Sequence, residues 1–151
     1  MEAPGYPGAF FFCMPEPVLS AGVVVVRCVD DEWRVLLLRV YNYWDFPKGR
    51  VETGEAALAT AKRETREETT LDDLEFAWGE SFMDTAPYGR EKKVARFFLA
   101  RTTTEKISLP VNPELGKPEH HEWRWCDWES AEQLVPERVW PVLRWAQDLL
   151  D

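Results

Sequence analysis

Residues 49–71 read GRVETGEAALATAKRETREETTL, and this stretch decides how the chain is interpreted. From residue 55 to residue 69 it is rich in Ala, Leu, Glu, Lys and Arg and contains no Pro or Gly, which predicts a helix of about four turns. On such a helix Glu64, Glu67 and Glu68 stand at positions i, i+3 and i+4. The spacing therefore gathers three carboxylates onto one stripe of the helix surface.

The acidic stripe has two interpretations. Like charges at this spacing repel by a few tenths of a kcal/mol, roughly, for each pair, so a stripe of acids needs a reason. Three oxygen ligands without a His or Cys suit a hard cation, Mg²⁺ or Mn²⁺. The alternative is a solvated acidic face with no ligand. Arg63 lies one turn before Glu67 and is expected to hold it by a charge-assisted hydrogen bond.

The spacing of fixed residues in this stretch resembles the Nudix box, which favours the metal site over the solvated face. Two positions depart from that pattern: Thr65 stands where an aliphatic residue is usual, and Thr70 stands where a Gly ends the helix. Because Thr adopts the left-handed conformation poorly, a different helix exit is expected, without loss of the metal site. The positions that match are Gly49, Glu55, Arg63, Glu64, Glu67, Glu68 and Leu71.

The resemblance implies an α/β fold, the Nudix α/β/α sandwich, with a central mixed sheet and a loop–helix–loop catalytic motif. It implies a metal-dependent hydrolase that cleaves a diphosphate linkage in a nucleoside polyphosphate. By the same resemblance Glu64, Glu67 and Glu68 would ligate the metals together with the Gly49 carbonyl. Arg63 and Glu55 would orient the acids. Apart from the resemblance, the residues before the helix offer Thr53 or Gly54 as its N-cap.

Two further segments point to a substrate class. Residues 44–49, WDFPKG, resemble the branch of the family that contains asymmetrical diadenosine tetraphosphate hydrolases. Residues 119–125, EHHEWRW, resemble a later segment that adds a Glu near the metals, which would be Glu119 or Glu122. The two histidines in that segment are interpreted as solvated. The residues expected to contact the substrate are Tyr43, Trp44, Lys48, Tyr88, Lys93 and Trp123.

The expected reaction is attack at phosphorus by a metal-activated water, with Glu64, Glu119 or Glu122 taking the proton. The alternative substrates are a nucleoside triphosphate, an RNA 5′ end and a diphosphoinositol polyphosphate. The alternative outside enzymes is a Nudix-like module that senses nucleotides without turning them over.

The rest of the chain predicts one domain at residues 18–151 after an extended lead-in at residues 1–17. Strands are expected at residues 18–29, 33–40, 74–84, 93–101 and 122–128. Loops are expected at residues 41–53 and 102–118, and further helices at residues 130–134 and 138–150.

Composition narrows the function classes. A net charge of −9 argues against bulk nucleic-acid binding, which needs clustered Lys and Arg. No apolar run approaches the length of a membrane span, so a membrane partner is not expected. The three cysteines, Cys13, Cys28 and Cys126, have no metal-ligand spacing and indicate a reducing cytoplasm. A small nucleotide is the expected partner, and the protein is expected to be a monomer or a homodimer.

Overall fold

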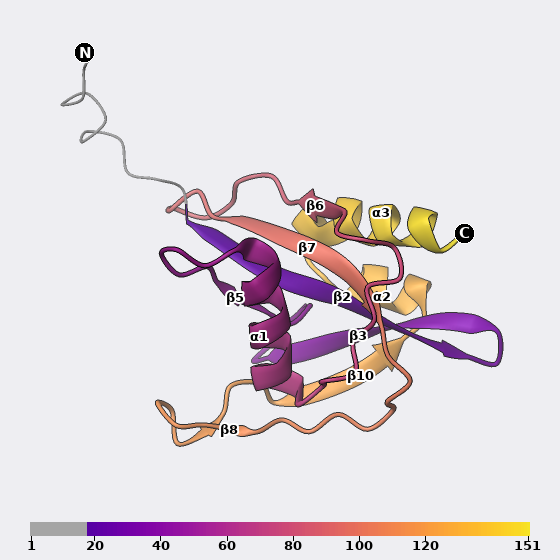
Figure 1. Cartoon of the computed structure of the whole chain (residues 1–151), viewed down its shortest axis with the longest axis horizontal. Coiled ribbons are helices and arrows are strands. Elements are labelled where there is room, and N and C mark those ends of the chain that lie inside the picture. Colours follow the sequence, from indigo (N-terminus) through magenta and orange to yellow (C-terminus); the bar gives the residue numbers. More distant parts are fainter. Residues whose placement is uncertain (1–17) are drawn as a thin grey trace, which may run out of the picture.

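The structure is a computed structural model that describes residues 18–151 (Figure 1). It is an α/β fold built on a seven-stranded mixed sheet in the order β10-β3-β2-β7-β6, in which β4 pairs with β3 and β5 pairs with β2. The expected lead-in at residues 1–17 lies outside the described residues. In residues 18–151 no helix has the length and hydropathy needed to cross a membrane. The strands are β2 (Leu19–Val29), β3 (Glu32–Val40), β4 (Tyr43–Asp45), β5 (Lys48–Arg50), β6 (Phe82–Asp84), β7 (Val94–Arg101) and β10 (Glu122–Cys126), with a separate pair β8 (Val111–Asn112) and β9 (Lys117–Pro118).

Strand β2 is the centre of the sheet because it pairs with β3 on one side and with β7 on the other. The β2–β3 hairpin closes at Asp30 and Asp31, whose φ angles of 52° and 66° give both central residues the left-handed conformation of a two-residue hairpin turn. The β2–β7 pairing is parallel, from Leu19 opposite Val94 onward. The long apolar run of β2 is explained by its position, since it is covered on both faces.

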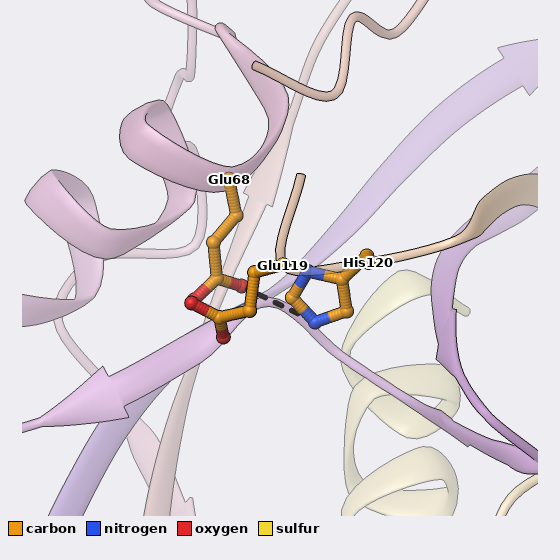
Figure 2. Close-up of side chains that lie close together, drawn as sticks. All are labelled: Glu68, Glu119 and His120. Atoms are coloured by element: carbon orange, nitrogen blue, oxygen red, sulfur yellow. Dashed lines mark ion pairs between the residues drawn. The ribbon is translucent and has the colours of Figure 1, made fainter. Parts of the chain in front are cut away.

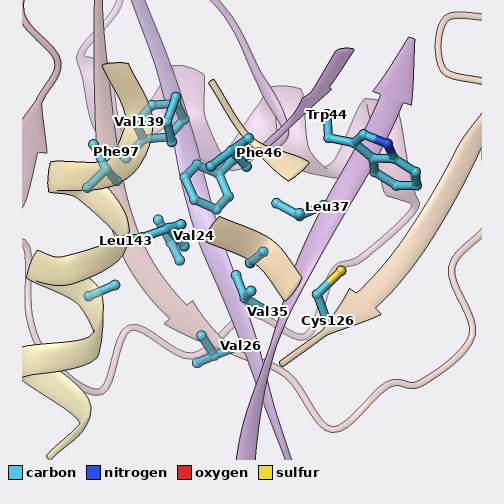
Figure 3. Packing of buried hydrophobic residues seen from close by; sticks show 14 of the residues in the cluster. Val24, Val26, Val35, Leu37, Trp44, Phe46, Phe97, Cys126, Val139 and Leu143 are labelled. Atoms are coloured by element: carbon cyan, nitrogen blue, oxygen red, sulfur yellow. The ribbon is translucent and has the colours of Figure 1, made fainter. Parts of the chain in front are cut away.

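Helices cover both faces of the sheet, which confirms the expected α/β/α sandwich. Helix α1 (Ala57–Thr69) packs on the face that carries Val23 and Val25. Helices α2 (Trp128–Leu134) and α3 (Trp140–Leu150), joined by the 3₁₀ turn η2 (Glu137–Val139), cover the opposite face. Figure 3 shows that second cluster, in which Phe46 and Phe97 meet edge to face with ring centroids 5.1 Å apart.

Three expectations about strands and loops were wrong. Residues 74–84 do not form one strand: only Phe82–Asp84 does, because a turn over residues 77–80 with Gly79 at φ 82° interrupts the segment. Residues 41–53 are not only a loop, since they supply β4 and β5 at the ends of β3 and β2. Residues 102–118 are not only a loop either, because β8 and β9 lie within them and pair with each other. The short strands form because they find pairing partners, which local propensity does not report.

The ends of the helices also differ from expectation. Helix α1 begins at Ala57 after Ala56, so neither Thr53 nor Gly54 is its N-cap. Thr70 takes the left-handed conformation after all, with φ 64° and ψ 8°, and its N–H donates to the Arg66 carbonyl at 2.8 Å. The helix exit is therefore the one that Gly would give, and the expectation of a different exit was wrong. Holding a β-branched residue there costs roughly 1–2 kcal/mol.

At the C-terminal end the expected strand at residues 122–128 stops at Cys126, because Asp127 caps α2. Its side chain accepts a hydrogen bond from the Ser130 N–H at 2.8 Å, so the helix starts at Trp128 and not at Ser130. The expected helix at residues 138–150 is divided into η2 and α3, with Pro141 in the first turn of α3.

Candidate metal and nucleotide site

Arg63 organises the acidic stripe of α1. Its Nε and Nη2 donate to the two oxygens of Glu55 at 2.9 and 3.0 Å, a bidentate pair. Its Nη1 donates to Glu64 at 3.1 Å and to Glu67 at 3.3 Å. The expected contact with Glu67 is present, but it is the longest of the set, and Arg63 binds Glu55 most closely. These hydrogen bonds lower the pKa of Glu55 to about 2.

Gly49 lies against the carboxylate of Glu64. A Cβ added at Gly49 would overlap the carboxylate of Glu64, so the close approach of β5 to α1 requires a glycine. A second glycine, Gly22 on β2, also allows a close approach, here between β2 and the start of β5. A Cβ at Gly22 would overlap the Pro47 carbonyl oxygen and the side chain of Lys48, which is the pairing partner of Gly22.

Glu68 is the most buried of the three box carboxylates, with 5% of its side chain exposed, against 17% for Glu64 and 56% for Glu67. Its Oε1 accepts a hydrogen bond from the Lys48 N–H at 3.3 Å. Its Oε2 is buried, and none of the described residues donates to it. A buried carboxylate oxygen without a donor is costly, so this atom needs an external partner.

His120 and Glu119 lie beside Glu68 (Figure 2). The Nε2 atom of His120 is 3.8 Å from Glu68 Oε1, and 13% of the His120 side chain is exposed. Burial, and then the charge of Lys48, lower the pKa of His120 to about 4, so its imidazole is neutral near pH 7 and the contact with Glu68 is not a salt bridge. The expectation that both histidines are solvated was wrong for His120. It was right for exposed His121, whose Nδ1 accepts a hydrogen bond from the Tyr41 N–H.

Two carboxylates of this region, Glu64 and Glu68, have pKa values above the ordinary value of Glu. Burial raises the pKa of Glu68 well above its ordinary value, and the charges of Glu119 and Glu64 add to the effect. Burial also raises the pKa of Glu64, against the attraction of Arg63, and Glu67 and Glu119 raise it further. Such mutual repulsion is relieved when a cation binds between the acids.

The acids face a cavity of about 710 Å³. The box helix contributes Glu64, Glu67 and Glu68 to one wall. The opposite wall comes from residues 109–114, in the long loop after β7. Glu52, from the loop after β5, and then Glu119 and His120 complete the lining.

A second cavity of about 230 Å³ adjoins the first, since Glu119 and His120 line both. Its lining is aromatic and cationic. Lys48 Nζ lies 3.0 Å from Asp45 Oδ2, and Arg138 Nη2 lies 3.3 Å from the same oxygen. Two cations share the Asp45 carboxylate, so the Lys48–Asp45–Arg138 group carries one net positive charge, and the Glu119 carboxylate lies elsewhere in the same lining. Burial lowers the pKa of Lys48, but the attraction and the hydrogen bond of Asp45 outweigh burial, and the pKa lies above its ordinary value.

The remaining sequence-predicted residues are distributed unevenly around these cavities. Tyr43 and Trp44 line the second cavity, Tyr43 with 67% exposure and Trp44 with only 7%, and the Arg124 guanidinium lies 4.7 Å from the Trp44 ring centroid. Glu122 opens β10, is paired with Arg39 and Arg124, and lines neither cavity.

Tyr88, Lys93 and Trp123 also line neither cavity. Tyr88 packs under the Arg138 guanidinium, which is 4.2 Å from its ring centroid, and Lys93 faces Glu91 at 3.6 Å. Trp123 packs against the core on the α1 side of the sheet.

Sequence reasoning missed His120 and Arg138. For His120 a signal was available, because it directly follows Glu119, one of the two Glu residues that the resemblance of residues 119–125 offers near the metals. For Arg138 there was none, since its approach to Asp45 joins η2 to β4 across 93 residues.

The side chains present fit a divalent cation. The donor set is three carboxylates beside the backbone of Gly49, and the buried Glu68 Oε2 has no other partner among the described residues. These oxygens are ligands that Mg²⁺ and Mn²⁺ prefer.

Comparisons with known proteins agree with this geometry. A family model described as the NUDIX domain matches residues 18–146. The asymmetrical bis(5′-nucleosyl)-tetraphosphatase of Caenorhabditis elegans is 32% identical over 124 residues, which cover 78% of this chain and 85% of that protein. The RNA pyrophosphohydrolase of Bartonella henselae is 24% identical over 137 residues, covering 77% of this chain and 79% of that protein. The solved structure of a C. elegans Ap4A hydrolase binary complex superposes with a TM-score of 0.74 at 25% identity, covering 88% of this chain and 97% of that one.

Proposed function

Because the chain belongs to the Nudix family of hydrolases, we propose that it cleaves a dinucleoside polyphosphate, such as diadenosine tetraphosphate, at a diphosphate linkage. The observation that carries this proposal is the pair of adjoining cavities that share Glu119 and His120, one acidic and one aromatic and cationic. The likeness to proteins named as asymmetrical tetraphosphatases supports the same substrate class. Asymmetrical cleavage would add one water and release a nucleoside triphosphate and a nucleoside monophosphate.

The two cavities divide the substrate between them. The larger cavity takes the polyphosphate chain together with Mg²⁺ or Mn²⁺, since its acids bind a cation and not an anion. The smaller cavity takes a nucleoside and the phosphate next to it. There Tyr43 offers an exposed ring for stacking, worth about 1–3 kcal/mol per base. The net positive charge of the Lys48–Asp45–Arg138 group faces the adjacent phosphate.

Glu67, Glu68 and the Gly49 carbonyl would hold the cation. When bound, a divalent cation neutralises charge on the phosphate oxygens and makes an attacking water more acidic. We assign the proton to Glu64: Arg63 binds its Oε2 at 3.1 Å and fixes the carboxylate in the cavity, and the described residues donate no hydrogen bond to Oε1. Glu122 does not suit this role because two arginines hold it outside the cavity.

The experiment that tests this function is a substrate panel with Mg²⁺, read by product chromatography. The panel contains diadenosine tetraphosphate, ATP, a 5′-triphosphorylated RNA and a diphosphoinositol polyphosphate. We expect diadenosine tetraphosphate to give ATP and AMP with the highest kcat/KM. A higher kcat/KM for the RNA would transfer the proposal to RNA 5′ ends, the substrate class named for the 24% identical relative. Tight nucleotide binding without any turnover would identify a sensing module.

A further inference from the structure

Three side chains that differ in chemistry converge at the inner end of the acidic cavity. One ligand atom each from Glu68, Glu119 and His120 lies within 4.8 Å of the other two (Figure 2). Glu68 comes from α1, whereas Glu119 and His120 belong to the segment between β9 and β10. This group differs from the rest of the acidic stripe because it includes a nitrogen donor.

The distance between His120 and Glu68 suits an ion between the two side chains better than a direct contact. His120 Nε2 is 3.8 Å from Glu68 Oε1, which is too long for a hydrogen bond. Two ligands of one ion, each bonded at about 2.0–2.2 Å, stand roughly 3–4 Å apart, and the observed separation falls in that range.

An independent observation also points to a missing partner. Glu68 Oε2 is buried, and none of the described residues gives it a hydrogen bond. Glu68 is more than nine-tenths buried and lines the cavity, so an ion bound in the cavity beside Glu68 would supply the partner that this oxygen lacks.

We propose that Glu68, Glu119 and His120 form a mixed nitrogen–oxygen site that binds a divalent transition ion of the Zn²⁺ or Co²⁺ type in preference to Mg²⁺. An imidazole donor favours such ions, whereas the oxygen-only set of Glu67, Glu68 and the Gly49 carbonyl favours Mg²⁺, so Glu68 is common to both positions. The cavity then has two unlike cation positions. The inference rests on the proposed function only in that this ion would occupy the same cavity as the polyphosphate.

The composition of the chain gives a direct test, because the two histidines are the only ones in the sequence. The protein, carrying no affinity tag, is labelled with ¹⁵N in its imidazole rings and titrated with Zn²⁺ and, separately, with Mg²⁺. We expect one equivalent of Zn²⁺ to move the Nε2 resonance of His120 and to leave that of His121 in place. Saturating Mg²⁺ should produce a much smaller change at His120. Equal shifts of both rings, or none at His120, would overturn the proposal.

A matched pair of variants makes the test quantitative. His120→Gln should raise the Kd for Zn²⁺, measured by competition with a chromophoric chelator, by about tenfold or more while the Kd for Mg²⁺ changes little. His121→Gln is the control, since its ring lies edge to face on Tyr41 away from the carboxylates, and its Zn²⁺ affinity should match that of the parent. An unchanged Kd for Zn²⁺ in a folded His120→Gln protein, as judged by thermal unfolding, refutes the site.

This readout separates the two proposals because it measures binding and not turnover. A protein that cleaves diadenosine tetraphosphate but shows no Zn²⁺ contact at His120 refutes the mixed site alone. A protein whose His120 binds Zn²⁺ but which cleaves no nucleotide of the panel refutes the proposed function alone.

Discussion

Residues 49–71 and residues 102–121 line the same acidic cavity, but they reach it in different ways. The first stretch is a strand, a loop and a helix whose contacts are local: Arg63 binds Glu55, Glu64 and Glu67, all within eight residues of it. The second is a long loop with two short strands, and it brings Glu119 and His120 to Glu68 from more than 50 residues away. Under the two proposals above, the helix supplies the chemistry of the reaction, and the loop adjusts which ion and substrate the site accepts.

The largest expected effect comes from the helix. Glu64→Gln should lower kcat by about 10²–10⁴-fold, because the proton acceptor is lost. Glu67→Gln should abolish turnover, and it should also weaken Mg²⁺ binding. Glu64→Gln should leave Mg²⁺ binding unchanged. Calorimetric Mg²⁺ titration of both variants separates the two roles. Glu114→Gln, which changes a carboxylate on the loop wall of the cavity, should leave kcat nearly unchanged. Full activity in Glu67→Gln would contradict the assignment of Glu67 as a metal ligand.

The next effect concerns the close contact between the strand and the helix. Gly49→Ala should lower kcat/KM on the order of 10²-fold, because the added Cβ displaces the Glu64 carboxylate. Gly54→Ala is the control in the same loop: no heavy atom lies within 4 Å of its added Cβ. Its φ of 82° should cost roughly 1 kcal/mol of stability but little activity. Steady-state kinetics and thermal unfolding of both variants measure the two effects. A larger loss of activity in Gly54→Ala than in Gly49→Ala would contradict the prediction.

A smaller effect is expected at the second cavity. Arg138→Met should raise KM for diadenosine tetraphosphate by about tenfold, the equivalent of one charge-assisted hydrogen bond to a phosphate, with little change in kcat. Arg144→Met removes an arginine of the same terminal region whose side chain is exposed, near Glu132, and should leave KM unchanged. Initial-rate measurements over a range of substrate concentrations give KM for both variants. Equal KM values for the two variants would exclude Arg138 from substrate binding.

These residues also show what could be read from the sequence. The acidic stripe, its arginine and the glycine at residue 49 follow from spacing within 23 residues, because a helix converts sequence distance into direction. The approach of Arg138 to Asp45 and the burial of His120 depend on how remote segments pack, which no local pattern encodes. The expectation of one strand over residues 74–84 failed for a related reason, since Glu75 makes only an isolated bridge to Arg101 and Phe82–Asp84 pair with β7 after the turn.

The smallest expected effect tests the end of the helix. Thr70→Gly should raise the free energy of unfolding by about 1 kcal/mol, because glycine enters the left-handed conformation without the cost that Thr70 bears. Urea unfolding measures the change, and kcat/KM should equal that of the parent because Thr70 is exposed and does not line the cavity. A loss of stability would show that Thr70 makes a favourable contact that outweighs its backbone conformation.

Gly22 has a consequence for anyone who would make this enzyme more stable. Among the valines of β2 it looks like a weak point of the strand, and a β-branched replacement there would be an obvious choice for a designer. Yet a side chain at Gly22 would displace Pro47 and Lys48, and with them the N–H that holds Glu68. The packing of β2 and the position of Glu68 therefore depend on each other. A larger side chain at Gly22 is expected to lower the activity of the enzyme even if it fills space in the sheet.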